Sequence, residues 1–172
     1  MTKPGRKKNR MNTGAIAKVC AGISHGRIVM WEYLPKRWTG EEAAKLYKGA
    51  ILKTLQKERG VKRKYLVFED NDPTGYKSGL GMDAKAECGI EAIPMPVSSP
   101  DLNPLDFCLW DEVSARMVAG APKHVETVCE YKKRLRLTAL RLSPSVVAKA
   151  VQAMPSRMRA VVDAKGYAIK AD

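Results

Sequence analysis

Acidic side chains in two short motifs are the residues of this 172-residue chain best suited to metal-ion chemistry. Glu-Asp-Asn-Asp-Pro occupies residues 69–73 and Ser-Pro-Asp-Leu-Asn-Pro-Leu-Asp occupies residues 99–106, so 35 residues separate Asp70 from Asp106. Two carboxylates held close together repel each other until a cation neutralises them, and oxygen ligands suit Mg²⁺ or Mn²⁺. Such ions can activate a water or a 3′-hydroxyl in phosphodiester chemistry. Asp70 and Asp106 are therefore candidate metal ligands.

The two aspartates must be positioned by a strand and a helix. The apolar run 65–68 is typical of a strand covered on both faces, and the turn formers that follow place Asp70 at its C-terminal end. Asn103 before Pro104 predicts a helix start, with Asp106 in the first turn. The buried face of this helix would hold Leu105, Leu109, Val113 and Met117, and Gly120 would end it. Spacing alone leaves both aspartates open to a second interpretation, as a turn residue and a helix-dipole partner.

The remaining pattern predicts an α/β chain. A hairpin turn at Ser24, His25 and Gly26 separates strands over Ala15–Ile23 and Arg27–Tyr33. A Thr39/Glu42 capping box starts a helix that ends at Gly60. Further along we expect a short helix at 78–88, a strand at 90–97 interrupted by two prolines, and helices at about 123–140, 144–153 and 156–165.

Charge is distributed unevenly along the chain, whose formal net charge is +13. Residues 1–64 carry 17 basic and 4 acidic side chains, residues 65–106 carry 2 and 8, and residues 107–172 carry 12 and 6. Basic surface of this extent attracts polyanions through counterion release, and an acidic centre suits cations. The pattern favours nucleic acid as a partner, although scattered lysines are equally typical of a solvated surface.

Composition excludes other classes of protein. No apolar run approaches the roughly 20 residues that span a bilayer, and no apolar stretch follows the basic N-terminus, so we expect a soluble, intracellular chain with no membrane partner. The cysteines lie too far apart for a zinc motif, so reduced, buried thiols are expected at Cys20, Cys88, Cys108 and Cys129.

The motifs at 69–73 and 99–106, together with Trp110, resemble the signature of mariner-type transposases of the DDE/DDD superfamily. The resemblance extends over roughly residues 15–166. It implies that Asp70 and Asp106 are the second and third catalytic acids of a metal-dependent site. It further implies an RNase H-like α/β fold with a mixed sheet flanked by helices, Mg²⁺ or Mn²⁺ as cofactor, DNA as partner, and DNA cleavage with strand transfer.

The chain departs from the family pattern at the first catalytic Asp, because no aspartate precedes Glu69. We therefore expect an N-terminally truncated form, in which the first catalytic strand is missing from the sheet and little activity remains. A smaller departure is Thr74, Gly75 and Tyr76, where the family often has a nearby histidine. Whether the chain is an enzyme is left open.

The expected organisation is a basic flexible arm at 1–14, a partial transposase catalytic domain at 15–120 and a helical C-terminal extension at 121–172. Three functions remain open at this stage: a transposase-type endonuclease, a non-catalytic nucleic-acid-binding protein derived from one, and a fragment with no stable fold. The resemblance also implies a nuclear location in a eukaryotic host, or the cytoplasm otherwise, and leaves a homodimer open.

Overall fold

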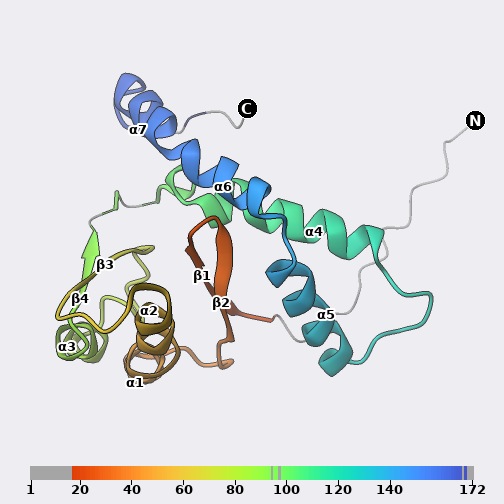
Figure 1. The fold of residues 1–172 in the computed structure, drawn as a ribbon, viewed down its shortest axis with the longest axis horizontal. Helices are drawn as coiled ribbons and strands as arrows, with labels where there is room; N and C mark the ends of the chain where they lie inside the picture. Colours follow the sequence, from red (N-terminus) through yellow and green to blue (C-terminus); the bar gives the residue numbers. More distant parts are fainter. Residues whose placement is uncertain (1–16, 94, 97, 168, 170–172) are drawn as a thin grey trace, which may run out of the picture.

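The computed structural model describes residues 17–93, 95–96, 98–167 and 169, whose strands form two separate two-stranded sheets. The expected arm at 1–14 lies outside these residues. One sheet is the antiparallel pair β1 (Val19–Ser24) and β2 (Arg27–Tyr33), and the other is the parallel pair β3 (Tyr65–Phe68) and β4 (Ile90–Ile93). The two sheets lie side by side in the centre and left of Figure 1.

The β1–β2 hairpin forms because its turn residues tolerate left-handed backbone angles. His25 and Gly26 have φ values of 49° and 71°, as a two-residue hairpin loop requires. The register pairs Val19 with Tyr33 and shifts between Gly22 and Ile23. At Gly26 the positive φ favours glycine, whereas an added Cβ would make only an ordinary contact, 3.4 Å from the Cβ atom of Ala148.

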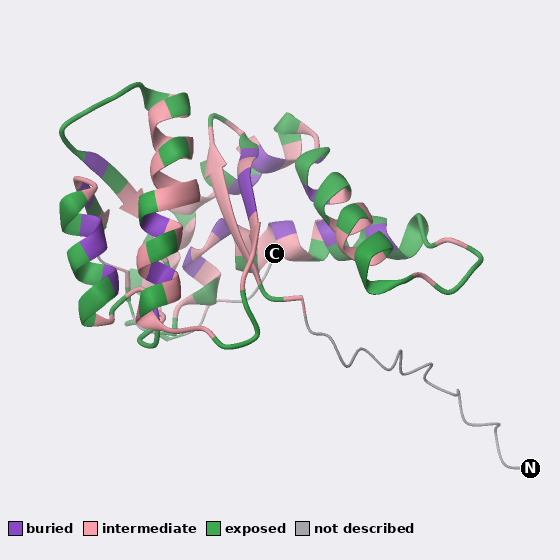
Figure 2. Ribbon diagram, turned by 90° about the horizontal axis from the view of Figure 1, so that it is seen from below, coloured by how far each residue is buried: buried purple, intermediate pink, exposed green. Residues whose placement is uncertain are grey.

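The parallel pair is covered on one face by helices. α1 (Gly40–Leu46), a π-helical turn η1 (Tyr47–Ile51) and α2 (Leu52–Arg59) run without a break, and α3 (Gly79–Glu87) makes the crossover between β3 and β4. The core beneath them consists of Ala43, Tyr47, Tyr65, Ala84 and Ile90. Figure 2 shows buried positions on these helices where they face one another.

The C-terminal part packs on the hairpin. It comprises η2 (Pro100–Leu102), the π-helical turn η3 (Leu105–Leu109), α4 (Trp110–Ala119), α5 (Val128–Leu140), α6 (Pro144–Gln152) and α7 (Met154–Asp163). A second core joins these elements to β2, and it includes Ile28, Trp31, Leu109, Val113, Met117, Ala139 and Val147. Across the described ranges, no helix is long and apolar enough to cross a membrane.

Most predicted elements are confirmed, including the helix that starts at Pro104 and buries Leu109, Val113 and Met117. Four predictions were wrong beyond small shifts at the ends of elements. The strand predicted over 90–97 ends at Ile93 as β4. Strand 65–68 is covered on one face only, since Leu66 is 66% exposed. The helix predicted from 123 begins at Val128, because Thr127 caps it there. The thiols are free as expected but not buried: Cys129 is exposed and the other three are partly exposed.

Candidate metal site

Glu69, the first acid after β3, is held inside the protein. Its carboxylate accepts a hydrogen bond from the Tyr47 hydroxyl at 2.5 Å and forms a short ion pair with Lys85 Nζ. Lys85 is the buried charged residue of the described core, and its ammonium also lies 5.2 Å from the centre of the Tyr47 ring. Both of the Glu69 oxygens are therefore occupied by residues from η1 and α3.

Asp72 is occupied by its own loop. Its Oδ2 atom accepts hydrogen bonds from Trp38 Nε1 at 2.6 Å and from the Gly75 N–H at 3.0 Å, and its Oδ1 atom accepts one from the Thr74 N–H at 3.2 Å. This is the local turn chemistry for which Asp is favoured. A side chain at Gly75 would collide with the Trp38 ring, 2.1 Å from Nε1. Asp72 thus stabilises the loop.

Asn71 ties the same loop to the end of the neighbouring strand. Its amide Nδ2 donates to the carbonyl oxygens of Met95 at 2.5 Å and Pro96 at 3.1 Å, just beyond β4. The loop after β3 and the chain leaving β4 are thereby held together at one edge of the sheet. This is the edge where open α/β sheets place their sites.

Asp70 is the acid of this motif that is left available. It is exposed, and no side chain of the described residues hydrogen-bonds to its carboxylate; the backbone N–H of Asp72 does. Because Glu69 is paired inside the core and Asp72 is half-buried and bonded within its turn, Asp70 is the exposed acid of this motif and the candidate cation ligand. The structure thus distinguishes Asp70 from its acidic neighbours.

Asp106 lies at the start of the η3–α4 helix, with both oxygens oriented. Asn103 Nδ2 donates to Oδ2 at 2.8 Å, and Trp110 Nε1 donates to Oδ1 at 3.1 Å. Asn103 also caps the helix, since its Oδ1 accepts the Leu105 N–H at 3.1 Å. Each carboxylate oxygen can accept more than one bond, so Asp106 remains open to a cation on its exposed side.

A contact from α7 braces this helix start. Arg157 donates from Nε to the carbonyl oxygen of Asp101 at 2.7 Å, and its guanidinium lies 4.2 Å from the centre of the Phe107 ring. Phe107 follows Asp106 directly. The C-terminal helix therefore fixes the segment that carries the second acid.

The charge of Asp106 reaches Asp70. Partial burial raises the pKa of Asp70, the Asp72 N–H opposes this, and the negative charges of Asp72, Asp106 and Glu69 raise the pKa further. Burial also raises the pKa of Asp106, opposed by the hydrogen bonds from Trp110 and Asn103. A cation between them would relieve this repulsion.

The donor set fits a hard divalent cation. Mg²⁺ commonly uses one or two protein carboxylates and takes its other oxygen ligands from waters and substrate phosphates. Asp70 and Asp106 supply two such carboxylates. Within the described ranges, no cluster of three or more His, Cys, Asp and Glu side chains has metal-binding geometry.

Strand β1 also approaches this edge. Burial raises the pKa of the Cys20 thiol to about 11, a hydrogen bond with Tyr76 opposes this, and the carboxylates of Asp70 and Glu69 add to the increase. Burial likewise raises the pKa of the Tyr76 hydroxyl. Neither group is ionised near neutral pH, so both are neutral neighbours of the site.

The sequence motifs predicted the two aspartates as site residues but not the residues that position them. The sequence motifs gave no role to Tyr47, Lys85 or Trp38, whose side chains contact Glu69 or Asp72. A lysine at a position of α3 that packs on the core could have signalled a buried ion pair, since lysine is almost never buried unless paired. The partner of that pair was not deducible without the fold.

Comparison with known proteins gives this geometry a context. The chain is 27% identical over 164 residues to the Tcb1 transposable-element transposase of Caenorhabditis briggsae, a match covering 88% of this chain and 58% of that protein. It is 30% identical over 112 residues to the Tc1 transposase of Caenorhabditis elegans, covering 65% of this chain and 39% of that protein. The chain thus spans less than two thirds of either relative. No protein-family model matches the sequence.

Solved structures show the same fold. The Mos1 transposase catalytic domain with Mn and raltegravir superposes with a TM-score of 0.73 at 18% identity, covering 88% of this chain and 76% of that one. A pre-cleavage Mos1 transpososome gives 0.75 at 17% identity, covering 99% of this chain and 51% of that one. These likenesses confirm the predicted RNase H-like mixed α/β fold. Together with the Tc1 and Tcb1 sequence relatives, they confirm the predicted resemblance to mariner-type transposases.

Proposed function

Because this chain is homologous to the Tc1 and Tcb1 transposases, we propose that it is a transposase-type endonuclease domain that acts on DNA with Mg²⁺ or Mn²⁺. The proposal rests on one observation. Asp70 is exposed while its neighbours Glu69 and Asp72 are held by other groups, and Asp106 is oriented by a hydrogen bond at the start of the η3–α4 helix. A Mos1 paired-end complex with the left transposon end, and Mos1 structures with Mn and Mg, are consistent with DNA and a divalent cation as partners here.

In this proposal each residue has a distinct task. Asp70 and Asp106 would hold the cation, which would supply Lewis-acid activation of an attacking oxygen and stabilisation of the leaving oxygen. Asn103 and Trp110 orient Asp106. Lys85 keeps Glu69 away from the cation by pairing with it inside the core.

Direct cation binding tests the site. Titration of the purified chain with Mn²⁺, followed by the electron paramagnetic resonance signal of free Mn²⁺, should show binding that Asp70→Asn and Asp106→Asn each abolish. The control is Asp83→Asn, which neutralises an exposed acid on α3 and should leave binding unchanged. Binding that survives both site substitutions would refute the assignment.

A second candidate function is non-catalytic DNA binding, with a nuclear location in a eukaryotic host. It is favoured by the small ligand set, since the described residues bring two carboxylates and no larger cluster to the site. A nicking assay on supercoiled plasmid distinguishes the endonuclease function from non-catalytic DNA binding. The endonuclease proposal expects slow nicking with Mn²⁺ that EDTA and Asp70→Asn abolish, whereas the binding proposal expects retention of the plasmid without any nicking above the buffer background.

A further inference from the structure

Helix α5 presents a basic face that the candidate metal site does not use. From Tyr131 in the helix to its C-cap Arg141, the sequence reads Tyr-Lys-Lys-Arg-Leu-Arg-Leu-Thr-Ala-Leu-Arg. One side packs on the protein, where Ala139 is fully buried and Leu135 is part of the core contacts. The opposite side carries the exposed residues Lys133, Arg136 and Arg141.

Two other cations of α5 are already engaged. Arg134 forms two hydrogen bonds of 2.6 and 2.7 Å to the Glu126 carboxylate and one of 2.8 Å to the Met117 carbonyl oxygen. The ammonium of Lys132 lies 5.1 Å from the centre of the Tyr33 ring. These contacts anchor α5 to α4 and β2, so the helix is a rigid support.

The three outward cations are available by contrast. In the part of the chain that the structure describes, Lys133, Arg136 and Arg141 form no ion pair. The nearest acid on the same helix, Glu130, is bound by the Thr127 N–H and hydroxyl, both at 2.8 Å. The Glu130 carboxylate is therefore engaged in capping the helix.

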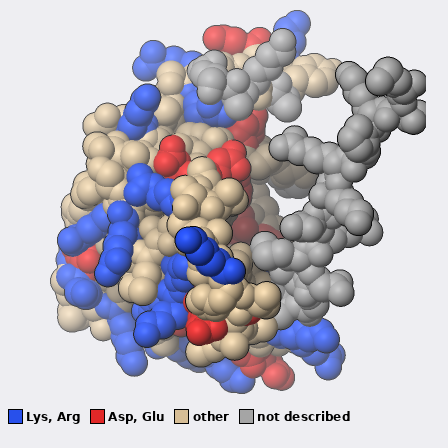
Figure 3. Space-filling model, turned by 90° about the vertical axis from the view of Figure 1, so that its right-hand side faces the viewer, with Lys and Arg blue, Asp and Glu red and all other residues tan. Residues whose placement is uncertain are grey.

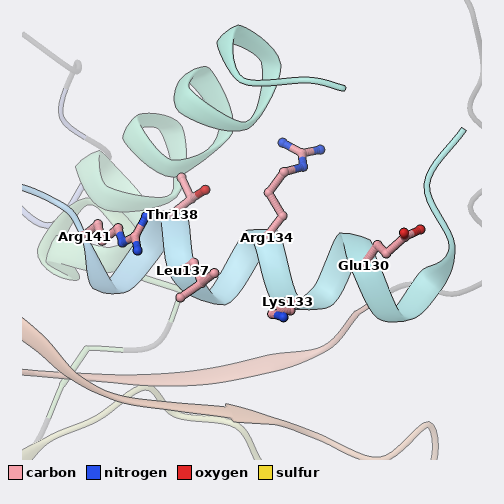
Figure 4. Close-up of a pocket in the computed structure, with 6 residues that line it drawn as sticks. All are labelled: Glu130, Lys133, Arg134, Leu137, Thr138 and Arg141. Carbon is pink, nitrogen blue, oxygen red and sulfur yellow. The ribbon is translucent and has the colours of Figure 1, made fainter. Parts of the chain in front are cut away.

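A shallow hollow of about 320 Å³ runs along this helix. Its lining is Glu130, Lys133, Arg134, Leu137, Thr138 and Arg141. Figure 4 shows Lys133 and Arg134 pointing to different sides of α5, so that Lys133 stays free while Arg134 reaches toward α4. Leu137 and Leu140 on the outer side are 40% and 39% exposed and add apolar surface between the charges.

The basic face lies away from the two aspartates. α5 joins α4 at Met117, eleven residues after Asp106, which corresponds to about 16 Å along a helix. Figure 3 shows the side of the molecule on which α5 lies, where Lys and Arg side chains predominate over Asp and Glu. A ligand bound here would therefore contact the protein at a distance from the metal site.

We propose that Lys133 and Arg136 on α5, with Arg141 at its C-cap, bind the phosphate backbone of duplex DNA outside the segment that reaches Asp70 and Asp106. The inference rests on the proposed function, since it takes DNA as the partner. From Lys133 to Arg141 the helix rises about 12 Å, which matches the width of the major groove, so the end charges reach phosphates on both sides of a groove. Contacts of this kind position DNA without reading its sequence.

The test is DNA binding by the full chain in EDTA, so that cleavage plays no part. Anisotropy of a labelled duplex is measured across a series of salt concentrations for the wild type and for the triple variant Lys133→Gln, Arg136→Gln, Arg141→Gln. The matched control, Lys53→Gln, Lys57→Gln, Arg59→Gln, removes the same charge from exposed positions of α2. Thermal melting of both variants verifies folding.

The α5 variant should bind at least about tenfold more weakly at low salt, with a log–log salt slope smaller by about 2 to 3, since each lost phosphate contact removes about 0.9. The α2 variant should bind like the wild type. Equal weakening of both variants, or none in the α5 variant, would overturn the inference.

Other outcomes separate this inference from the proposed function. A wild type that shows no salt-sensitive binding contradicts DNA as the partner, and so both proposals. A wild type that binds while the α5 variant is unaffected contradicts this inference alone. If the α5 substitutions instead change the sedimentation of DNA-free protein, the face is a protein interface and the inference is wrong.

Discussion

Lys85 Nζ and the Glu69 carboxylate form a buried ion pair directly behind the loop that presents Asp70 to solvent. The side chains are 5% and 14% exposed, and the Tyr47 hydroxyl supplies a second bond to the carboxylate. Consecutive side chains of an extended chain point to opposite sides. Holding Glu69 inward therefore favours the outward direction of Asp70, and links the stability of the core to the geometry of the site.

Replacing Lys85 by Met should destabilise the protein strongly, because Glu69 would remain buried without its cation. Breaking one partner of a buried pair typically costs about 3–5 kcal/mol of the free energy of unfolding. Urea denaturation followed by circular dichroism measures this loss. Tyr47→Phe removes only a hydrogen bond to a charged group and should cost less, about 1.5–3 kcal/mol.

The double variant Lys85→Met, Glu69→Leu is the control for that prediction. It removes both charges and keeps apolar volume, so it should be more stable than Lys85→Met alone. If the single Lys85→Met variant lost less than about 1 kcal/mol, the ion pair would not be the buried anchor described above.

Asp70 should weaken the metal-free fold at neutral pH. Its folded-state pKa is raised, first by partial burial, so the ionised form is disfavoured in the folded protein relative to the unfolded chain. This free-energy cost is fully present above the folded-state pKa of Asp70 and disappears as pH falls below the unfolded-state pKa. Without metal, the contribution of Asp70 to stability therefore becomes more favourable as the pH decreases. At pH 7 Asp70→Asn should raise the melting temperature by up to about 2–4 °C, equivalent to at most about 1 kcal/mol at an exposed site.

Mg²⁺ should reverse this order of melting temperatures, so that the wild type melts above Asp70→Asn. A cation that binds only the folded state raises the melting temperature of the wild type, and Asp70→Asn should remove that increase. Scanning calorimetry in MgCl₂ and in EDTA measures both effects, with Asp83→Asn as the control that leaves them unchanged. An equal Mg²⁺ effect on the wild type and Asp70→Asn would contradict the assignment.

Trp110 should tune the affinity of the site through Asp106. Its indole N–H bonds to Oδ1 and helps to lower the pKa of that carboxyl, so Trp110→Phe should leave Asp106 less oriented and harder to ionise. Residues that orient metal ligands typically contribute 10- to 100-fold to affinity, and at this exposed site we expect about tenfold. Isothermal titration with Mn²⁺ measures it.

The chain offers a matched control in Trp31. Its buried ring packs edge-on against Trp110, with ring centres 5.7 Å apart, and the bond to Asp106 comes from Trp110, so Trp31→Phe changes the tryptophan packing without removing that bond. It should leave Mn²⁺ affinity unchanged. A similar loss of affinity in both variants would mean that tryptophan packing, rather than the bond to Asp106, supports the site.

Local signals predicted much of the fold, and long-range contacts account for what was missed. Asn103 with Pro104 predicted the helix start because the cap is made within a few residues. The one-sided covering of β3 could not be predicted, because the exposure of Leu66 depends on which elements pack over it. The roles of Lys85 and Trp38 were missed for the same reason, since their partners Glu69 and Asp72 lie 16 and 34 residues away.

The sequence also contains a capping box at Thr127 and Glu130 that was not predicted. It forms a complete capping box, in which its hydroxyl accepts the Glu130 N–H at 3.2 Å and the Glu130 carboxylate accepts the Thr127 N–H at 2.8 Å. The expected box at Thr39 is half made: its hydroxyl accepts the Glu42 N–H at 3.4 Å, whereas the Glu42 carboxylate pairs with Lys45. The stronger cap thus begins the helix whose basic face we assign to DNA.

Thr127→Ala should therefore destabilise more than Thr39→Ala. Loss of an N-cap typically costs about 1 kcal/mol, and the Thr127 substitution also frees the Glu130 carboxylate beside Lys133. We expect a decrease in melting temperature of about 2–4 °C for Thr127→Ala and a smaller one for Thr39→Ala, measured by circular dichroism. DNA affinity gives an independent readout, because only Thr127→Ala should weaken binding to the α5 face by fraying its first turn. If Thr39→Ala weakened DNA binding as much, the effect would reflect general stability and not the positioning of α5.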